Sequence, residues 1–345
     1  MGGGWWAGLV TWFIGVTRPG IALPGAARPL EAEELAQRAE AIGCEAVWVL
    51  DTRREPYLSA AAALRATERV QVGTNVAVAF ARSPAVTAAA AWDLAQWGGG
   101  GRFVLGLGSQ VGGTLEARFG VSADKPAPRM RDYIAAVRAC WEAYRRGHGR
   151  YEGKYYTIRW PVFQPGAEPD ITPPLIYLAA VNPIMVGVAG ECADGLAAHP
   201  FTTPEYIRDV MLPALAKGAA KAGRPSPPLM LQLVVAPDRD AAVRQMTAYC
   251  VPAYRRVLDH AGLGEVFDAI WAAGREGRRA EARELLDDQV LDRLGVIVGD
   301  DLAKGLARWS GLADRLSLSV PWYGIEHHRQ LESARRLLSL VETQL

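Results

Sequence analysis

Short apolar runs recur along the chain, and the stretches between them have helical patterns. Most of these runs are nearly continuously apolar and rich in β-branched residues, which is typical of parallel strands covered on both faces. Eight of them are predicted to be strands: Pro19–Pro24, Ala46–Leu50, Val70–Val78, Arg102–Gly108, Leu175–Ala180, Gly195–His199, Leu229–Ala236 and Leu316–Val320. Strands that alternate with helices eight times predict an α/β fold, a (β/α)8 TIM barrel.

Two of the predicted helices show clear boundary or packing signals. Leu30–Ile42 is acidic in its first turn and is followed by Gly43, which agrees with the helix dipole and with the preference for glycine after a helix. In Pro128–Arg146 apolar residues recur every three or four positions, which predicts an amphipathic helix.

Insertions after strands 4 and 7 interrupt the simple alternation. Residues 111–174 contain the helix 128–146 and a predicted hairpin over 151–160, whereas residues 238–298 are mostly helical and charged. Charge runs of that kind indicate solvated helix faces. We expect a single barrel domain over 19–345, preceded by an atypical N-terminal extension over 1–18. The apolar run in that extension is too short to span a bilayer and lacks the basic start of a secretory signal.

Composition narrows the classes of partner. The net charge is +1, from 38 basic and 37 acidic residues, so no excess charge favours nucleic acid or an anionic membrane. The four cysteines are widely spaced without a C-x-x-C pair, which favours structural thiols in a reducing compartment. No H-E-x-x-H or similar ligand pattern predicts a metal site. We therefore expect a cytoplasmic protein that acts on a small-molecule substrate, without nucleic acid, membrane or metal.

Candidate site residues are those that follow the strands, because the active site of such a barrel lies at the C-terminal ends of its strands. The GLGS sequence at 106–109 has two interpretations, anion binding or a tight turn. AAVNP at 179–183 ends a strand and begins a helix, whose free N–H groups attract phosphate. The residues at these positions are Asp51, Thr52, Arg53, Arg54, Glu55, Ser109, Gln110, Val181, Asn182, Pro183, His199, Trp322 and Tyr323.

His199 is the imidazole that these predictions place at the strand ends. It is either a hydrogen-bonded core residue or a functional one. An ordinary histidine pKa of about 6.5 suits proton donation near neutrality. We therefore assign His199 as the candidate catalytic residue, which either donates a proton or orients the substrate; Tyr323 and solvent are the alternative proton sources.

Three segments resemble the luciferase-like flavin and deazaflavin oxidoreductases, the bacterial luciferase superfamily. They are GRFVLGLGSQ (101–110), EGKYY (152–156) and LIYLAAVNPIMVGVAGECADGLAAHP (175–200). Each contains a turn rich in small or polar residues, which would let backbone amides approach an anionic ligand. The resemblance covers about 19–345 and is to the branch that depends on the deazaflavin coenzyme F420. The resemblance implies that the cofactor is coenzyme F420, that the fold is the barrel and that the protein forms a homodimer.

The resemblance also implies roles for individual residues. The loop after the fifth strand would bind the cofactor phosphate, the turn after the fourth would border the cofactor, and Asp51 would contact the deazaflavin ring system. The alternative for Asp51 is an N-cap of the following helix. The third strand would carry a bulge with a non-proline cis peptide at Asn75–Val76 that backs the ring. The cofactor-binding residues implied are Asp51, Asn75, Val76, Val78, Ser109, Gln110, Val181, Asn182, Ile184 and Met185.

The chain departs from the sugar-phosphate dehydrogenases of this family, which use a His and a Glu as acid and base. The aligned positions hold Thr52 and Val111, and neither supports acid–base chemistry near neutral pH. Hydride transfer survives this departure, because the cofactor supplies it. The leading hypothesis is an F420-dependent oxidoreductase that transfers a hydride between the deazaflavin and a small organic substrate. The alternatives are an FMN-dependent luciferase-like monooxygenase and a non-catalytic barrel that acts as a binding subunit.

Overall fold

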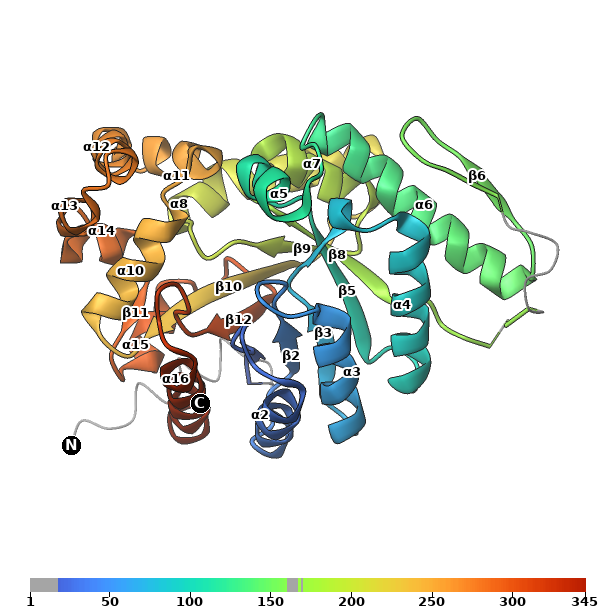
Figure 1. Ribbon diagram of the computed structural model, residues 1–345, viewed down its shortest axis with the longest axis horizontal. Coiled ribbons are helices and arrows are strands. Elements are labelled where there is room, and N and C mark those ends of the chain that lie inside the picture. The colour runs from blue at the N-terminus through green and yellow to red at the C-terminus, as the bar shows by residue number, and fades with distance from the viewer. Residues whose placement is uncertain (1–17, 160–166, 169) are drawn as a thin grey trace.

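The centre of the molecule is a closed barrel of parallel strands (Figure 1). The computed structural model describes residues 18–159, 167, 168 and 170–345, so most of the predicted extension 1–18 lies outside the described residues. Neighbouring strands pair in parallel, and β12 closes the barrel against β1. The barrel strands are β1 (Gly20–Ala22), β2 (Ala46–Val49), β3 (Gln71–Thr74) continued by β4 (Ala77–Val78), β5 (Phe103–Gly108), β8 (Leu175–Ala180), β9 (Gly195–Ala198), β10 (Leu229–Ala236) and β12 (Arg315–Ser319). The predicted α/β barrel and its strands are confirmed.

Helices that follow the strands form the outer layer (Figure 1). Several of them begin with proline, which fits the first helical turn because its missing N–H would have no intrahelical acceptor there. Gly43 ends the first of these helices with a positive φ of 81°. The outer helices are α2 (Pro29–Ala41), α3 (Pro56–Ala66), α4 (Pro84–Trp97), α6 (Pro126–Arg146), α7 (Pro183–Cys192), α8 (Pro204–Tyr206), α9 (Leu212–Lys221), α10 (Arg239–Tyr249) and α16 (His327–Gln344).

Both predicted insertions are present, and in Figure 1 they lie at opposite ends of the long axis. After β5 the chain adds α5 (Gly112–Phe119) and, beyond α6, the antiparallel hairpin of β6 (Arg150–Glu152) and β7 (Thr157–Arg159). The second insertion follows β10 and extends the sheet by one short strand, β11, which pairs with β10. Beyond α10 it comprises η3 (Pro252–Tyr254), α11 (Arg255–His260), α12 (Gly264–Arg275), α13 (Arg279–Glu284), α14 (Asp288–Arg293), β11 (Ile297–Val298) and α15 (Leu302–Ala307).

Side chains fill the barrel interior near the N-terminal ends of the strands. The fully buried Trp48 indole packs against Tyr177, with ring centroids 6.1 Å apart. A Cβ on Gly20 or Gly73 would lie 2.7 or 2.5 Å from this indole, so both positions require glycine. Because this end of the barrel is packed, the opposite end, formed by the C-terminal ends of the strands and here called the barrel mouth, is where a ligand can enter.

Candidate functional site at the barrel mouth

A backbone bulge joins β3 to β4 at the barrel mouth, and the peptide bond between Asn75 and Val76 within it is cis. This confirms the predicted position of the cis peptide. Asn75 Nδ2 donates a hydrogen bond of 2.8 Å to Gln232 Oε1 on β10, which ties the bulge to a strand on the far side of the barrel interior. The bulge therefore has a fixed position relative to β10.

The glycines of GLGS are explained by this bulge. A Cβ on Gly106 would lie 1.8 Å from the Thr74 carbonyl oxygen, and a Cβ on Gly108 would lie 2.5 Å from the Val76 side chain. The Thr74 hydroxyl donates to the Gly106 carbonyl (2.7 Å) and accepts from its N–H (3.0 Å). Close approach of the two strands thus requires these glycines, whether or not an anion binds nearby.

Ser109 and Gln110 follow β5 in a sharp turn. Gln110 has a positive φ of 61°, a conformation that a residue other than glycine seldom adopts. Its Oε1 accepts a 2.9 Å hydrogen bond from the N–H of Val111, the residue that precedes α5. The Ser109 hydroxyl donates to the Gln110 carbonyl at 3.3 Å. Both side chains are only partly buried, so they border the barrel mouth.

The start of α7 leaves backbone donors unpaired. Asn182 precedes this helix, but its side chain does not cap it; instead Nδ2 donates to the Ala253 carbonyl in the second insertion, at 2.9 Å. Within the described residues, the N–H groups of Ile184 and Met185 have no acceptor. The Val181 carbonyl is occupied, because it accepts from the Tyr206 hydroxyl at 3.2 Å. The arrangement can bind an anion through the two free N–H groups.

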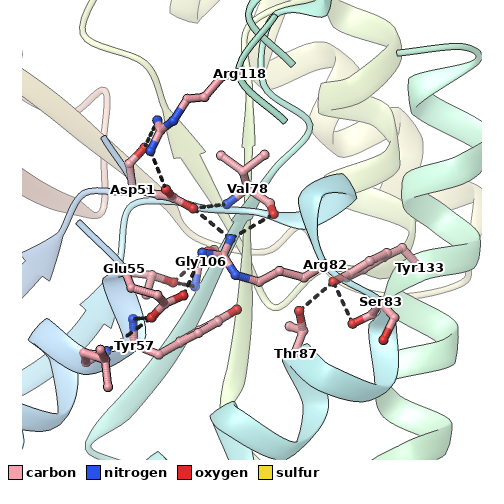
Figure 2. A network of polar contacts seen from close by, with 12 residues as sticks. Asp51, Glu55, Tyr57, Val78, Arg82, Ser83, Thr87, Gly106, Arg118 and Tyr133 are labelled. Atoms are coloured by element: carbon pink, nitrogen blue, oxygen red, sulfur yellow. Dashed lines mark hydrogen bonds and ion pairs between the residues drawn. The ribbon is translucent and has the colours of Figure 1, made fainter. Parts of the chain in front are cut away.

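Asp51 lies at the end of β2 in a polar network (Figure 2). Its carboxylate is 2% exposed. Oδ2 accepts from the Val78 N–H at 3.1 Å and from Arg82 at 2.8 Å, and Oδ1 accepts from Arg118 at 3.4 Å. The alternative that Asp51 caps the next helix is wrong, because Glu55 accepts from the first N–H groups of α3. Asp51 instead holds together β2, β4 and α5.

The EGKYY segment forms the turn between β6 and β7, and its amides bind the protein itself. The N–H groups of Tyr155 and Tyr156 donate to the Asp132 carboxylate on α6 at 2.6 and 3.0 Å. The Tyr151 hydroxyl donates to the same carboxylate at 2.5 Å. The amides of this turn are predicted to approach an anionic ligand. In the structure the anion that they bind is the Asp132 carboxylate of the protein itself, which fastens the hairpin to α6.

His199 follows β9 at the barrel mouth and is surrounded by aromatic rings. The Tyr254 ring stacks on the imidazole and the Tyr249 ring meets it edge-on, each with centroids 4.5 Å from it. Nδ1 accepts a 3.1 Å hydrogen bond from the Phe201 N–H, so in the neutral ring the proton is on Nε2. Burial lowers the His199 pKa to about 3.

The premise that His199 keeps an ordinary pKa is therefore wrong. At neutral pH the imidazole is uncharged, and it has no surplus proton to donate. Its Nε2–H can still donate a hydrogen bond to a substrate oxygen, so of the two predicted roles the structure favours orientation of the substrate. That role remains a prediction.

The lowered pKa predicts how His199 contributes to acid sensitivity. The folded-state pKa lies below the ordinary value of about 6.5, so unfolding takes up about one proton at this residue between those two pH values. The associated stability is fully present above pH 6.5 and is lost as the pH falls toward 3. Urea unfolding at pH 7.5 and pH 5 should show a smaller loss of stability for His199→Gln than for the wild type. An equal loss in both proteins would contradict the lowered pKa.

Sequence reasoning missed three residues that shape the barrel mouth: Gln232, Tyr249 and Tyr254. The two tyrosines lie in the second insertion, where no motif indicated a functional residue, and only their contacts with His199 reveal them. Gln232 lies within an apolar strand and is 8% exposed. A lone polar residue in such a strand is a signal that could have been found, because a buried amide needs a partner.

Two other features of the described residues do not form a site. No group of three or more His, Cys, Asp or Glu side chains there is placed to hold a metal ion. A depression of about 780 Å³ lies at the other end of the barrel, beside Trp97 and Arg102. Arg102 is already engaged, since it donates to the Leu64, Val70 and Gly98 carbonyls. This depression lies beside the start of β5, away from the C-terminal ends of the strands, and we assign it no chemistry.

In the described part of the chain, every helix is too short or too polar to cross a bilayer.

Comparisons with known proteins agree with the barrel fold. The family model described as luciferase-like monooxygenase matches residues 10–305. An uncharacterized protein of Mycobacterium tuberculosis is 34% identical over 302 residues, which cover 83% of this chain and 88% of that protein. A second protein of that organism, provisionally named a coenzyme F420-dependent oxidoreductase, is 30% identical over 319 residues, which cover 83% and 89%.

Among solved structures, the coenzyme F420 dependent tetrahydromethanopterin reductase of Methanopyrus kandleri has a TM-score of 0.76 at 20% identity. The match covers 95% of this chain and 98% of that one. At this identity the match shows that the two proteins share a fold. Together with the family match over most of the chain, it shows that this chain belongs to the luciferase-like monooxygenase family of enzymes.

Proposed function

We propose that this chain is a coenzyme F420-dependent oxidoreductase that transfers a hydride between the deazaflavin and a small organic substrate. The observation that carries the proposal is the start of α7, where Asn182 turns away and leaves the N–H groups of Ile184 and Met185 unpaired. A phosphate-bearing cofactor matches this set of donors. The provisional name of the relative from Mycobacterium tuberculosis supports the deazaflavin as that cofactor.

The other residues at the barrel mouth fit a planar cofactor beside this anion site. Ser109 and Gln110 border the mouth, and the bulge at Asn75–Val76 is held in place there by the hydrogen bond from Asn75 to Gln232. When bound, the deazaflavin supplies hydride chemistry, and the protein supplies binding and orientation. Asp51 accepts a hydrogen bond from the Val78 N–H, next to the bulge. We therefore propose that Asp51 contributes to cofactor binding indirectly, by holding the bulge in place.

No side chain equivalent to the acid–base pair of the sugar-phosphate dehydrogenases is found at the aligned positions. The Thr52 hydroxyl packs against Gly25, where a Cβ would lie only 1.8 Å from it. Val111 precedes α5 and offers no titratable group. We therefore propose a substrate other than a sugar phosphate.

Titration of the purified protein with coenzyme F420 and with FMN tests the cofactor. We expect F420 to bind at least about tenfold more tightly than FMN, measured by calorimetry and by deazaflavin fluorescence. Tighter binding of FMN would instead support a flavin-dependent monooxygenase of the same family. If neither cofactor bound, the chain would be a binding subunit without this chemistry, and the proposal would fail.

A further inference from the structure

The aromatic cluster of His199, Tyr249 and Tyr254 is not explained by cofactor binding. It combines the end of β9 with the second insertion, and Phe201 packs beneath the two tyrosines at 6.2 and 6.0 Å between ring centroids. Phe201 is fully buried, whereas His199, Tyr249 and Tyr254 are partly exposed residues. These three residues, at the C-terminal end of β9 and in the second insertion, are therefore the part of the cluster that a ligand can reach.

The surroundings of the cluster are uncharged. Burial is the sole cause of the lowered His199 pKa, and no charged side chain perturbs Tyr254. Two arginines of the second insertion have partners elsewhere: Arg255 is paired with Asp268 and Arg244 with Asp240. Arg256 is exposed, and its charge acts on Tyr206 rather than on His199 or Tyr254. Arg82, at the other side of the barrel mouth, is held between Asp51 and Glu55 (Figure 2).

The polar groups that remain near the cluster are neutral. His199 keeps the proton on Nε2, because Nδ1 accepts from the Phe201 N–H. Gln245, fully buried on α10, accepts from the N–H groups of Trp322 and Tyr323 through Oε1, and its side chain also interacts with Tyr249.

We propose that the aromatic cluster binds the ring of an uncharged, planar substrate, with the His199 Nε2–H directed to a neutral oxygen such as a carbonyl. Aromatic rings attract one another in stacked and edge-to-face geometries, and an ionised substrate would lose its hydration here without gaining an opposite charge. This inference names the substrate class for the proposed function and rests on that function for the reaction, although ring binding can be measured without it.

Three probes test the inference by calorimetry on the 345-residue chain without added cofactor. 2-Acetonaphthone is planar, aromatic and uncharged; 2-naphthoate has the same ring system with a carboxylate; cyclohexyl methyl ketone is uncharged without an aromatic ring. At pH 7.5 we expect 2-acetonaphthone to bind at least about tenfold more tightly than 2-naphthoate and about threefold to tenfold more tightly than cyclohexyl methyl ketone. Equal or tighter binding of 2-naphthoate would overturn the inference.

Variants at Tyr254 locate the binding. Tyr254→Leu should lose about threefold to tenfold in affinity for 2-acetonaphthone, whereas Tyr254→Phe keeps the ring and should stay within about twofold of the wild type. Unchanged affinity in Tyr254→Leu would place the ring elsewhere and overturn the inference. The melting temperature of each variant verifies its folding, and Tyr249→Leu and Tyr249→Phe repeat the comparison if Tyr254→Leu does not fold.

Failure of the proposed function would look different from failure of this inference. If 2-acetonaphthone bound as expected but coenzyme F420 did not, the cofactor assignment would fall and the ring-binding cluster would stand. If F420 bound but the protein did not bind 2-acetonaphthone more tightly than 2-naphthoate, the ring-binding cluster would fall and the cofactor assignment would stand.

Discussion

Replacing Ile184 with aspartate is expected to weaken coenzyme F420 binding roughly tenfold to hundredfold. Ile184 is 75% exposed at the start of α7, beside the two free N–H groups proposed to hold the cofactor phosphate. Two like charges about 5–8 Å apart near a protein surface repel each other by roughly 2–3 kcal/mol. The measurement is F420 affinity by calorimetry at low ionic strength, repeated at higher salt, where the loss should shrink.

Aspartate at position 184 should leave the folding of the protein unaffected. An acidic residue in the first turn of a helix interacts favourably with the helix dipole, so Ile184→Asp should melt at or above the wild-type temperature. Ile184→Asn is the matched control, because it has the same shape without the charge. Equal F420 affinities for Ile184→Asp and Ile184→Asn would show that the cofactor phosphate does not bind at the start of α7. Aspartate at the buried Val181 would give a less clear result, since it would also disturb packing.

Asp51→Ala is expected to reduce the free energy of unfolding by about 3–5 kcal/mol, the usual consequence of removing one partner of a buried ion pair. The change would leave the Val78 N–H without its acceptor and the largely buried Arg82 with Glu55 alone. Guanidinium unfolding curves measure the loss. Glu55→Gln serves as a control, because it removes a charge from the same network at a more exposed position and should cost about 1 kcal/mol or less.

This prediction also separates two roles for Asp51. A residue that only contacts the cofactor would lose F420 affinity on substitution without a change in stability. The network of Figure 2 leads us to expect a loss of stability first, with any loss of affinity following from displacement of the bulge. Asp51→Ala with wild-type unfolding and greatly weakened F420 binding would show direct contact and contradict the structural role.

The barrel could be predicted from sequence because its strands are local patterns. Each strand is a short apolar run, and the stretches between strands carry their own helix signals. The prediction of a cis peptide at Asn75–Val76 rested on the family resemblance, since nothing in the local sequence indicates such a bond. GLGS was ambiguous for a physical reason: close approach of strands and close approach of a ligand both demand glycine, and only the structure shows that Thr74 and Val76 occupy the space.

The contacts of the site were much harder to predict. Asp51 meets Arg82 and Arg118, which lie 31 and 67 residues further along the chain. The rings around His199 come from an insertion whose charge pattern gave no sign of function. The His199 pKa depends entirely on those surroundings. A sequence shows which groups can titrate, but the direction of a pKa shift is decided by neighbours that the fold brings together.

One backbone segment joins the two proposed binding functions. The Ala253 carbonyl accepts from Asn182, which precedes the proposed phosphate site, and the next residue, Tyr254, stacks on His199. If a ligand orders this segment from one side, the cost of ordering it from the other side falls. The two proposed ligands would then be thermodynamically linked through it, and by reciprocity each would raise the affinity for the other by the same factor. On the proposed function, the insertion after β10 would let an enzyme that has already bound its cofactor select its substrate.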